Sequence, residues 1–234
     1  MYKDFKIALS GGQGSGKSSL AFAWSKKHDV PLSKSVTQDI MAIFGFQNHK
    51  QVIKAGVTTP EVGIEFQKAL ATEKLKEFVE TESGIVSDRG LIDIFTYYAL
   101  HNSAFAKEST NEEMKNILLE FVKHTDLIVF LSPKLSKVED NGVRVNSSVY
   151  YETVSSVMYS TMNSIISTYD SIEGIIQESF RFKDSNISAH ISFSPSMAIL
   201  HIDESSCKDG IASVSQRIEV IESVLEDLER YRGK

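Results

Sequence analysis

The sequence predicts an α/β fold in which a central, mostly parallel sheet of five strands is covered by helices on both faces. Short apolar segments at 5–10, 33–37, 84–87, 127–131 and 198–202 have the length and composition of buried strands. Between them lie longer stretches whose apolar residues recur at helical spacing. Strands that alternate with helices in this way form βαβ units, which build parallel sheets covered on both sides.

The composition is that of an ordinary globular protein, and we expect a single domain over residues 1–234. The chain is 41% apolar and 24% charged, with a formal net charge of −6. This acidic balance argues against broad, non-specific binding to nucleic acid. The one cysteine, Cys207, excludes an internal disulfide and favours a reducing compartment. No segment has the roughly 18 apolar residues of a membrane span, so we expect a cytoplasmic protein without membrane association.

The elements of the first half follow from local signals. The apolar run at 5–10 ends in glycines, and a helical pattern over 17–28 follows it. A short strand is expected at 33–37 and a short helix at 39–44. The segment 59–61 supplies a threonine cap, a first-turn proline and a first-turn acid, so we expect a helix from there to about residue 82.

In the second half, Thr110 and Glu113 form a capping box that predicts the start of a helix. Pro133 ends the strand at 127–131, and a helix is expected over 149–169. The last helix carries an apolar stripe that is either a core-packing face or a homodimer seam, and we favour the core. The stripe consists of Ile211, Val214, Ile218, Ile221, Leu225 and Leu228.

A glycine-rich segment between the first strand and the first helix carries the strongest functional signal. Residues 11–18 match the phosphate-loop pattern G-x-x-x-x-G-K-[ST] at every position. Glycines let the backbone adopt positive φ, so that its N–H groups and the following helix N-terminus converge on phosphate oxygens. We expect Lys17 to reach the β- and γ-phosphates and Ser18 to ligate Mg²⁺. The predicted nucleotide-binding residues are Gly11, Gly12, Gln13, Gly14, Ser15, Gly16, Lys17, Ser18 and Ser19.

The strand at 84–87 supplies a second set of candidates, because ligands of parallel sheets bind beyond the carboxyl ends of the strands. It ends in Asp88 and Arg89, whereas the strand at 127–131 ends without an acid. The Asp88 carboxylate suits Mg²⁺ or its water shell, and the Arg89 guanidinium suits an acceptor or the transferring phosphate. A surface salt bridge at this turn is the alternative interpretation.

In this order of motifs the chain resembles AAA-type P-loop kinase domains related to thymidylate, deoxynucleoside and nicotinamide-riboside kinases, which are often phage-encoded. The resemblance rests on the phosphate loop, the D-R-G-x-x-D segment at 88–93 and the D-N-G-V-R segment at 140–144. It implies the three-layer P-loop kinase fold, ATP and Mg²⁺ as cofactors, and a mobile lid at 134–150. Within that lid, Arg144 is expected to close over the γ-phosphate. A viral origin would place the protein in a host cytoplasm.

Two chemical classes of phosphoryl acceptor, a phosphate and a hydroxyl, are compatible with these motifs. A phosphate acceptor needs several arginines, whereas a hydroxyl acceptor profits from a carboxylate that takes its proton. Three of the six arginines lie in the terminal helix, which leaves Arg89, Arg144 and Arg181. Asp39 is the candidate base, although a role in a short helix explains it equally well. The small number of arginines outside the terminal helix and the presence of Asp39 both favour a hydroxyl acceptor. Candidate contacts to a nucleobase are Phe44, Phe46 and Gln67.

The segment 172–197 exceeds what a minimal kinase needs, and we expect an inserted β-hairpin there. It interleaves aromatic and basic residues, which either stack on the bases of a single strand or form an edge hairpin or an oligomer contact, and we favour the latter two. Three functions stay open: phosphoryl transfer to a nucleoside or nucleotide, transfer to a hydroxyl in DNA, and nucleotide hydrolysis without an acceptor. No strand ends in the acid pair expected of a hydrolytic motor, so a phosphotransferase is favoured.

Overall fold

Six strands form one mixed sheet in the computed structural model, which describes residues 2–33, 36–132, 148–182, 187–194, 197–203 and 213–233. The strands are β1 (Lys6–Gly11), β2 (Ile85–Ser87), β3 (Leu127–Leu131), β4 (Ile176–Phe182), β5 (Ile187–Phe193) and β6 (Ala198–Asp203). Their order is β2-β1-β3-β6-β5-β4, parallel from β2 to β6 and antiparallel from β6 to β4. The expected α/β class and mostly parallel sheet are confirmed.

The register of the parallel strands brings the ends of β1, β2 and β3 to one edge of the sheet. Ala8 lies beside Ser87, and Gly11 lies beside Leu131. The loops that follow β1 and β2 therefore start close together, which is where a parallel sheet places its ligands.

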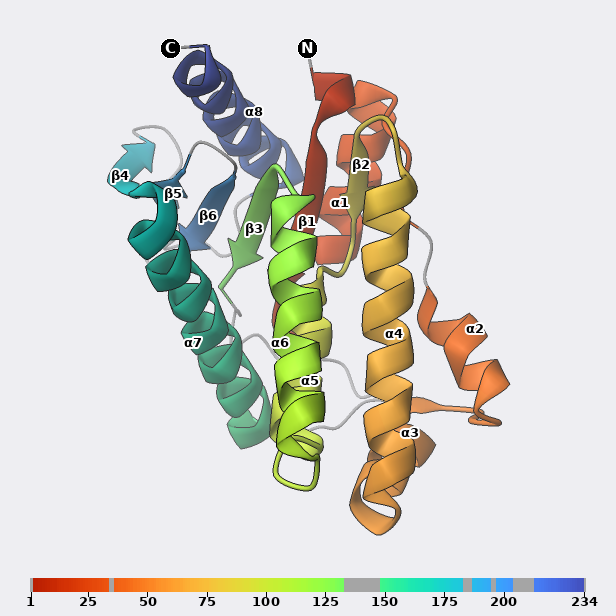
Figure 1. The fold of residues 1–234 in the computed structure, drawn as a ribbon. Coiled ribbons are helices and arrows are strands. Elements are labelled where there is room, and N and C mark those ends of the chain that lie inside the picture. The colour runs from red at the N-terminus through yellow and green to blue at the C-terminus, as the bar shows by residue number, and fades with distance from the viewer. Residues whose placement is uncertain are drawn as a thin grey trace.

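Helices cover both faces of the sheet (Figure 1). One face carries α1 (Lys17–His28) and α8 (Val214–Arg232), which contact each other. The other face carries α4 (Pro60–Glu80), α5 (Leu91–His101), α6 (Glu108–Lys123) and α7 (Ser148–Glu173). Two short helices, α2 (Val36–Ile43) and α3 (His49–Thr58), contact α4 beyond the end of the sheet, and a 3-10 turn (Tyr2–Asp4) precedes β1.

Alternate residues of the central strands belong to two separate cores. Ile7 and Leu9 of β1 lie in the core under α1 and α8, whereas Ala8 lies in the core under the other four helices. Both faces of β1 and β3 are thus buried, which explains why these strands are nearly continuous apolar runs.

The sheet has one strand more than the five expected, and two segments account for the difference. No strand is found in the described part of the segment 33–37, whose residues 34 and 35 lie outside the described ranges: an isolated bridge joins Leu32 to Val86, and Val36 already begins α2. The segment 172–197 instead contains β4 and β5, an antiparallel pair that continues the main sheet beyond β6. A hairpin was expected in this segment, but its place in the sheet was not, because the pairing of β5 with β6 does not follow from the pattern of the hairpin itself.

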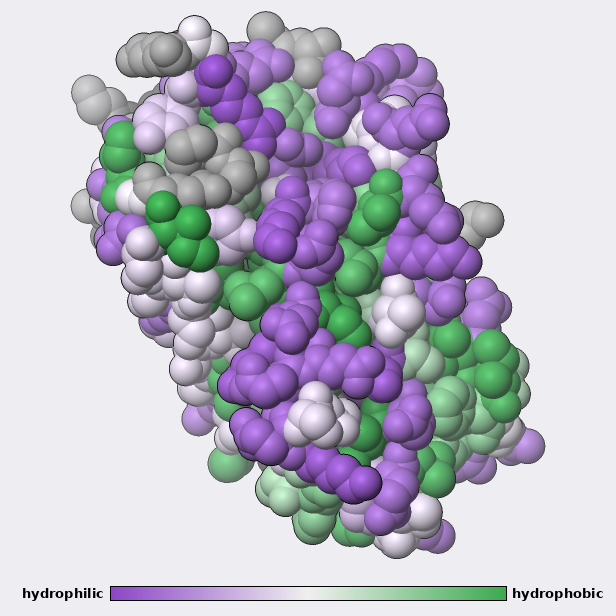
Figure 2. Space-filling model, in the orientation of Figure 1, coloured by the Kyte–Doolittle hydropathy of each residue, from purple (hydrophilic) through white to green (hydrophobic). Residues whose placement is uncertain are grey.

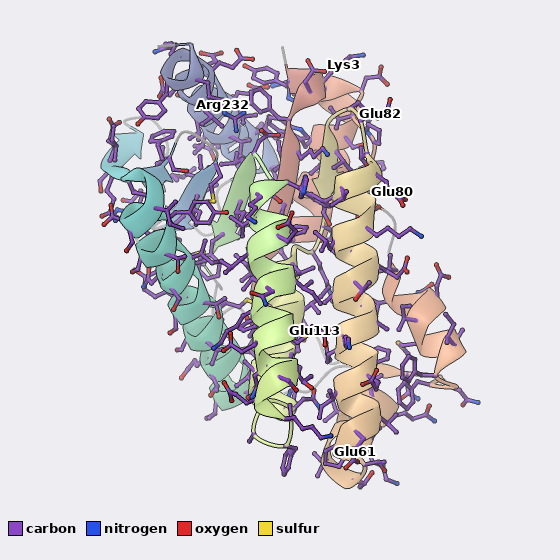
Figure 3. All side chains as sticks on the ribbon, viewed as in Figure 1. Lys3, Glu61, Glu80, Glu82, Glu113 and Arg232 are labelled. Carbon is purple, nitrogen blue, oxygen red and sulfur yellow. The ribbon has the colours of Figure 1, made fainter. Side chains whose placement is uncertain are left out.

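The capping box expected at Thr110 and Glu113 was wrong. Helix α6 begins earlier, with Lys107 as its N-cap and no side-chain hydrogen bond to its first turn. Glu113 faces α4, where its carboxylate lies 2.8 Å from the ammonium of Lys68 (Figure 3). The Glu113 carboxylate, which the expected capping box would have used, therefore pairs with a lysine of another helix instead.

The apolar stripe of α8 faces the core, which confirms the favoured interpretation. Ile218, Ile221, Leu225 and Leu228 are all buried, and Ile211 lies outside the described residues. On the surface, the outer face of α4 and α6 is largely hydrophilic, whereas hydrophobic side chains gather over α2 (Figure 2). Within the described ranges, none of the helices has the length and apolar character needed to cross a membrane.

Candidate functional site

The glycine-rich segment forms a loop between β1 and α1, as the sequence predicts. Gly11, Gly14 and Gly16 have φ values of 149°, 81° and 84°, in the region that favours glycine. A Cβ atom at Gly11 would lie only 2.5 Å from the carbonyl oxygen of Leu131, so the close approach of β3 also requires glycine there. No described side chain caps the N-terminus of α1. The loop and the helix end together provide backbone donors for an anion.

Lys17 lies within the loop rather than in solvent. Its Nζ donates to the carbonyl oxygens of Gly11 at 2.5 Å and Gly12 at 2.9 Å. A carboxylate oxygen of Asp93, from α5, lies 3.8 Å from the same ammonium. Burial raises the pKa of Asp93, and the positive charge of Lys17 opposes that shift. The loop lysine is therefore held among main-chain oxygens beside a buried acid.

The two residues predicted to hold a metal ion lie in contact. The Ser18 hydroxyl donates to Oδ2 of Asp88 at 2.7 Å. The second carboxylate oxygen of Asp88, Oδ1, is buried and has no hydrogen-bond partner among the described residues. Mg²⁺ in nucleotide sites has few protein ligands and completes its shell with phosphate oxygens and water. The Ser18 hydroxyl and the Asp88 carboxylate, next to the phosphate loop, fit such an ion.

Asp88 and Arg89 lie on a turn between β2 and α5 that is held against β1. The N–H of Gly90 donates to the carbonyl oxygen of Leu9 at 3.0 Å. A Cβ atom at Gly90 would lie 3.1 Å from the Ser10 hydroxyl and 3.2 Å from Cβ of Ala8, so a larger residue would push the turn away from the sheet. The Arg89 side chain is exposed. The sequence prediction that these residues meet the phosphate loop agrees with this geometry.

A cavity of about 480 Å³ opens beside the phosphate loop, which is the size range of small-molecule sites. Gln13 of the loop lines it, together with Asp88 and Arg89 of the turn. Phe66 and Gln67 of α4 line another part of its wall. The Asp88–Arg89 turn is therefore shared by the phosphate loop and the cavity, so that two ligands bound in them would meet at this turn.

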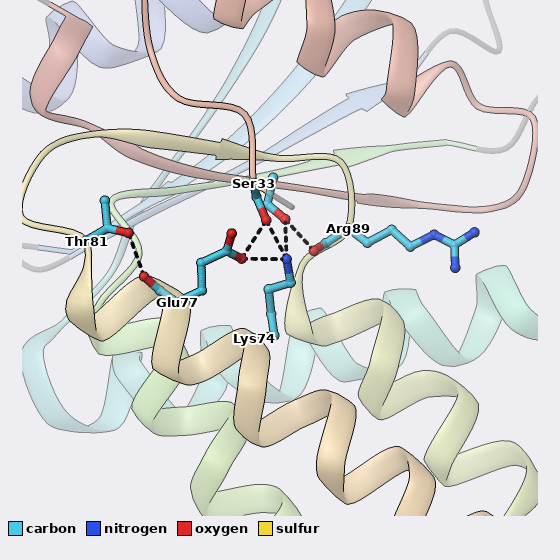
Figure 4. Close-up of polar contacts among 6 residues, drawn as sticks. Ser33, Lys74, Glu77, Thr81 and Arg89 are labelled. Carbon is cyan, nitrogen blue, oxygen red and sulfur yellow. Dashed lines mark hydrogen bonds and ion pairs between the residues drawn. The ribbon is translucent and has the colours of Figure 1, made fainter. Parts of the chain in front are cut away.

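A buried lysine connects the shared turn to α4 (Figure 4). Lys74 is 4% exposed, and its Nζ lies 2.5 Å from the Ser33 hydroxyl, 2.8 Å from the Glu77 carboxylate and 3.3 Å from the Ser87 hydroxyl. The Ser87 hydroxyl in turn donates to the main-chain carbonyl oxygen of Arg89 at 2.7 Å. The Arg89 guanidinium points away from this cluster. The cluster thus constrains the backbone of the turn and leaves the guanidinium free of it.

Aromatic and imidazole rings form a further wall of the cavity. Tyr97 and His101 of α5 stack with ring centroids 6.4 Å apart, and Nε2 of His101 lies 3.1 Å from the Tyr150 hydroxyl of α7. Burial lowers the pKa of His101 and raises the pKa of both tyrosines. All three side chains are therefore predominantly neutral at pH 7, which suits an uncharged, planar part of a ligand.

Several sequence-predicted residues lie away from the cavity. Asp39 is exposed on α2 and does not line it, although its neighbours Thr37 and Gln38 do. Phe44 and Phe46 contact Phe66 edge to face, each at a centroid distance of 5.5 Å, and belong to the core next to the cavity wall. Arg144 and residues 134–147 of the expected lid lie outside the described residues. The side chain of Arg181 does too.

Sequence reasoning missed two residues of the site. Lys74 occupies an ordinary helical position, and only the tertiary structure shows that it is 4% exposed and contacts Ser33 and Ser87. Arg217 was assigned to the terminal helix, away from the site, but its Nη1 donates to the carbonyl oxygen of Ser15 in the phosphate loop at 2.9 Å. The two residues are 202 positions apart, so no local pattern in the sequence could connect them.

Comparison with solved structures finds similar folds among nucleoside kinases. Deoxyadenosine kinase from M. mycoides with dCMP and dCDP matches with a TM-score of 0.53 and 16% identity, over 96% of this chain and 100% of that chain. The same enzyme with dCTP matches with a TM-score of 0.54 and 16% identity, over 95% and 100%. At such identities the likeness establishes the fold alone. A comparison with curated protein sequences finds no match.

The family comparison covers the site itself. A family model described as an AAA domain matches residues 6–171, more than half of the chain. This region contains the phosphate loop, the Asp88–Arg89 turn and the helices that wall the cavity. The chain therefore belongs to the AAA domain family and has the fold of the P-loop kinases.

Proposed function

We propose that the protein is a kinase that transfers the γ-phosphoryl group of ATP to a hydroxyl group of a nucleoside or nucleotide. One observation carries the proposal: the phosphate loop and a cavity of about 480 Å³ share the Asp88–Arg89 turn. A donor tail in the loop and a nucleoside-sized acceptor in the cavity would meet there, which is what in-line phosphoryl transfer requires.

The chain's own residues supply binding and charge stabilisation on the donor side. Backbone N–H groups of the loop and of α1 bind the polyphosphate, and Lys17 offsets its negative charge. Ser18 and Asp88 would hold Mg²⁺, which neutralises charge on the β- and γ-phosphates when it is bound. Arg89, exposed at the cavity wall, is placed to contact the transferring group or the acceptor.

The charges that line the cavity favour a hydroxyl over a phosphate acceptor. Asp88 and Asp93 contribute two carboxylates, Lys74 is paired with Glu77, and Arg89 is the guanidinium among the described lining residues. A phosphate acceptor would bring further negative charge into this cavity, and Arg89 is the one exposed guanidinium among the described lining residues that could bind it. A neutral nucleoside brings none. We expect Gln67 to hydrogen-bond a nucleobase; Phe66 lines the same wall from α4, and Tyr97 lines a further wall from α5.

The acceptor hydroxyl has to lose a proton, and two carboxylates compete for this role. Asp39 is the candidate from the sequence, and Asp93 is the acid that lines the cavity directly and whose pKa burial raises. Asp39→Asn and Asp93→Asn separate the two. An Asp39→Asn variant with full activity removes Asp39 from the reaction.

The proposal is tested by transfer of labelled γ-phosphate to nucleosides, nucleoside monophosphates, single-stranded DNA and duplex DNA. We expect labelled nucleoside monophosphate as the main product. Lys17→Ala should abolish it without unfolding the protein, whereas Lys26→Ala, an exposed lysine on the same helix, should retain it. Labelled DNA would support the polynucleotide alternative. Release of ADP without transfer of label to any of these acceptors would favour a nucleotide hydrolase and contradict the proposal.

A further inference from the structure

The C-terminal helix places a guanidinium group directly behind the phosphate loop. Arg217 lies in the first turn of α8 and is 2% exposed, so its charge is removed from solvent. Its Nη1 donates to the carbonyl oxygen of Ser15 at 2.9 Å. A buried guanidinium is costly unless its donors are used, and here one of them is used on the backbone of the nucleotide site.

This hydrogen bond determines the direction of a donor in the loop. Ser15 and Gly16 share a trans peptide, in which the C=O and N–H groups point in opposite directions. With the Ser15 carbonyl turned toward Arg217, the N–H of Gly16 points away from α8 and from the guanidinium. It is therefore available on the side of the loop where a phosphate oxygen binds.

Gly16 itself does not fix this peptide. A glycine populates positive and negative φ about equally, so the 15–16 peptide plane can rotate unless something outside the loop holds it. Gly16 has φ +84°, and a Cβ atom there would lie 2.6 Å from Nη1 of Arg217. The positive φ is what requires glycine at position 16, and the Arg217 guanidinium, hydrogen-bonded to the Ser15 carbonyl oxygen, restrains the freedom that this glycine brings.

We propose that Arg217 is a positioning residue for polyphosphate binding: it holds the 15–16 peptide so that the Gly16 N–H faces the phosphates. The proposal rests on the proposed function only in that the loop binds a nucleoside triphosphate. It also gives α8 a role in the site, although α8 lies beyond the 6–171 region of the family match. The positive charge behind the loop adds to the potential that attracts the anion.

The test measures binding of Mg-ATP and of inorganic tripolyphosphate by calorimetry, for the wild type and for Arg217→Met, Arg217→Lys and Arg230→Met. Arg230 lies on the same helix, and its guanidinium pairs at 2.9 Å with Asp227 on the protein surface. We expect Arg217→Met to weaken both ligands by roughly ten- to a hundred-fold, in line with loss of a charge-assisted hydrogen bond. Arg217→Lys should recover part of the loss, and Arg230→Met should bind like the wild type.

A purely structural role for Arg217 predicts a different pattern. In that case the variants would lose thermal stability, and the KM values for ATP and for the acceptor would rise together. The inference requires a rise in the KM for ATP with the acceptor KM unchanged, measured well below the melting temperature. It is overturned if Arg217→Met binds tripolyphosphate as tightly as Arg230→Met does. If the wild type binds neither tripolyphosphate nor ATP, the proposed function fails first.

Discussion

Replacing Lys74 by methionine removes a buried charge but keeps most of the side-chain volume, so its effect can be worked out from the contacts of the ammonium. The Nζ atom lies 2.5 Å from the Ser33 hydroxyl, 2.8 Å from the Glu77 carboxylate and 3.3 Å from the Ser87 hydroxyl. The Lys74 and Glu77 side chains are 5% and 19% exposed. Without the ammonium, the Glu77 carboxylate stays largely buried and keeps only the Ser33 hydroxyl among these contacts.

Removing one partner of a buried ion pair lowers the free energy of unfolding by about 3 to 5 kcal/mol. Because Glu77 keeps some exposure to solvent, we expect a loss of about 3 kcal/mol for Lys74→Met. For a chain of this length that corresponds to a fall in melting temperature of about 6 to 12 °C. Replacing both partners removes the unpaired charge, so Lys74→Met/Glu77→Met should recover at least half of the loss.

Urea denaturation followed by circular dichroism measures these differences. Lys68→Met is the matched control, because this lysine lies on the same helix and pairs with Glu113 in an exposed position, at 32% and 46% exposure. It should change the free energy of unfolding by no more than about 0.5 kcal/mol. A loss below about 1 kcal/mol for Lys74→Met, or a double variant less stable than the single one, would refute the reasoning.

Three further predictions concern the metal site, a helix contact and pH. Asp88→Asn should raise the Mg²⁺ concentration needed for half-maximal activity and lower kcat by about a hundredfold; unchanged Mg²⁺ dependence would exclude Asp88 as a ligand. Gly63→Ala should lower the free energy of unfolding by about 1 to 3 kcal/mol, because its Cβ would lie 2.5 Å from Nδ2 of Asn102 and 2.7 Å from Cα of Gly56; full stability would contradict that close approach. Burial lowers the pKa of His101 below its ordinary 6.5, so the unfolded chain binds more protons and stability should fall as the pH drops through 6.5 toward 5. His101→Phe should make this fall shallower, and an unchanged slope between pH 7 and 5 would show that His101 does not contribute.

The site divides into a part with a sequence signature and a part without one. The phosphate loop was predicted residue by residue, because a strand, a set of glycines and a helix N-terminus are all encoded within a few positions. Asp88 and Arg89 were predicted because carboxyl ends of parallel strands meet at one edge. Of the residues predicted for the acceptor, Gln67 lines the cavity, whereas Phe44 and Phe46 do not. Asp39 lies outside the cavity lining, and the described walls come from five helices, α2, α3, α4, α5 and α7, whose buried faces look alike in sequence.

Two basic residues near the site, Arg217 and Lys74, likewise have no local sequence signature. Arg217 was set aside because it lies in the terminal helix, yet its guanidinium contacts the phosphate loop. Lys74 was overlooked because a lysine in a helix is usually solvated, and here it is 4% exposed. Both residues act through long-range contacts with backbone or hydroxyl groups, which leave no periodic pattern.

By itself the sequence determined the α/β class, the parallel centre of the sheet and the phosphate loop, since each of these depends on short-range rules of periodicity, backbone freedom and helix termini. Tertiary structure alone decided that β4 and β5 extend the sheet beyond β6, that a cavity lies beside the Asp88–Arg89 turn, that Lys74 contacts Ser87 next to this turn, and that Arg217 contacts the phosphate loop. The physical reason is that these features consist of contacts between segments distant in the chain. Their energies come from burial and pairing after the elements pack, and no local segment records them.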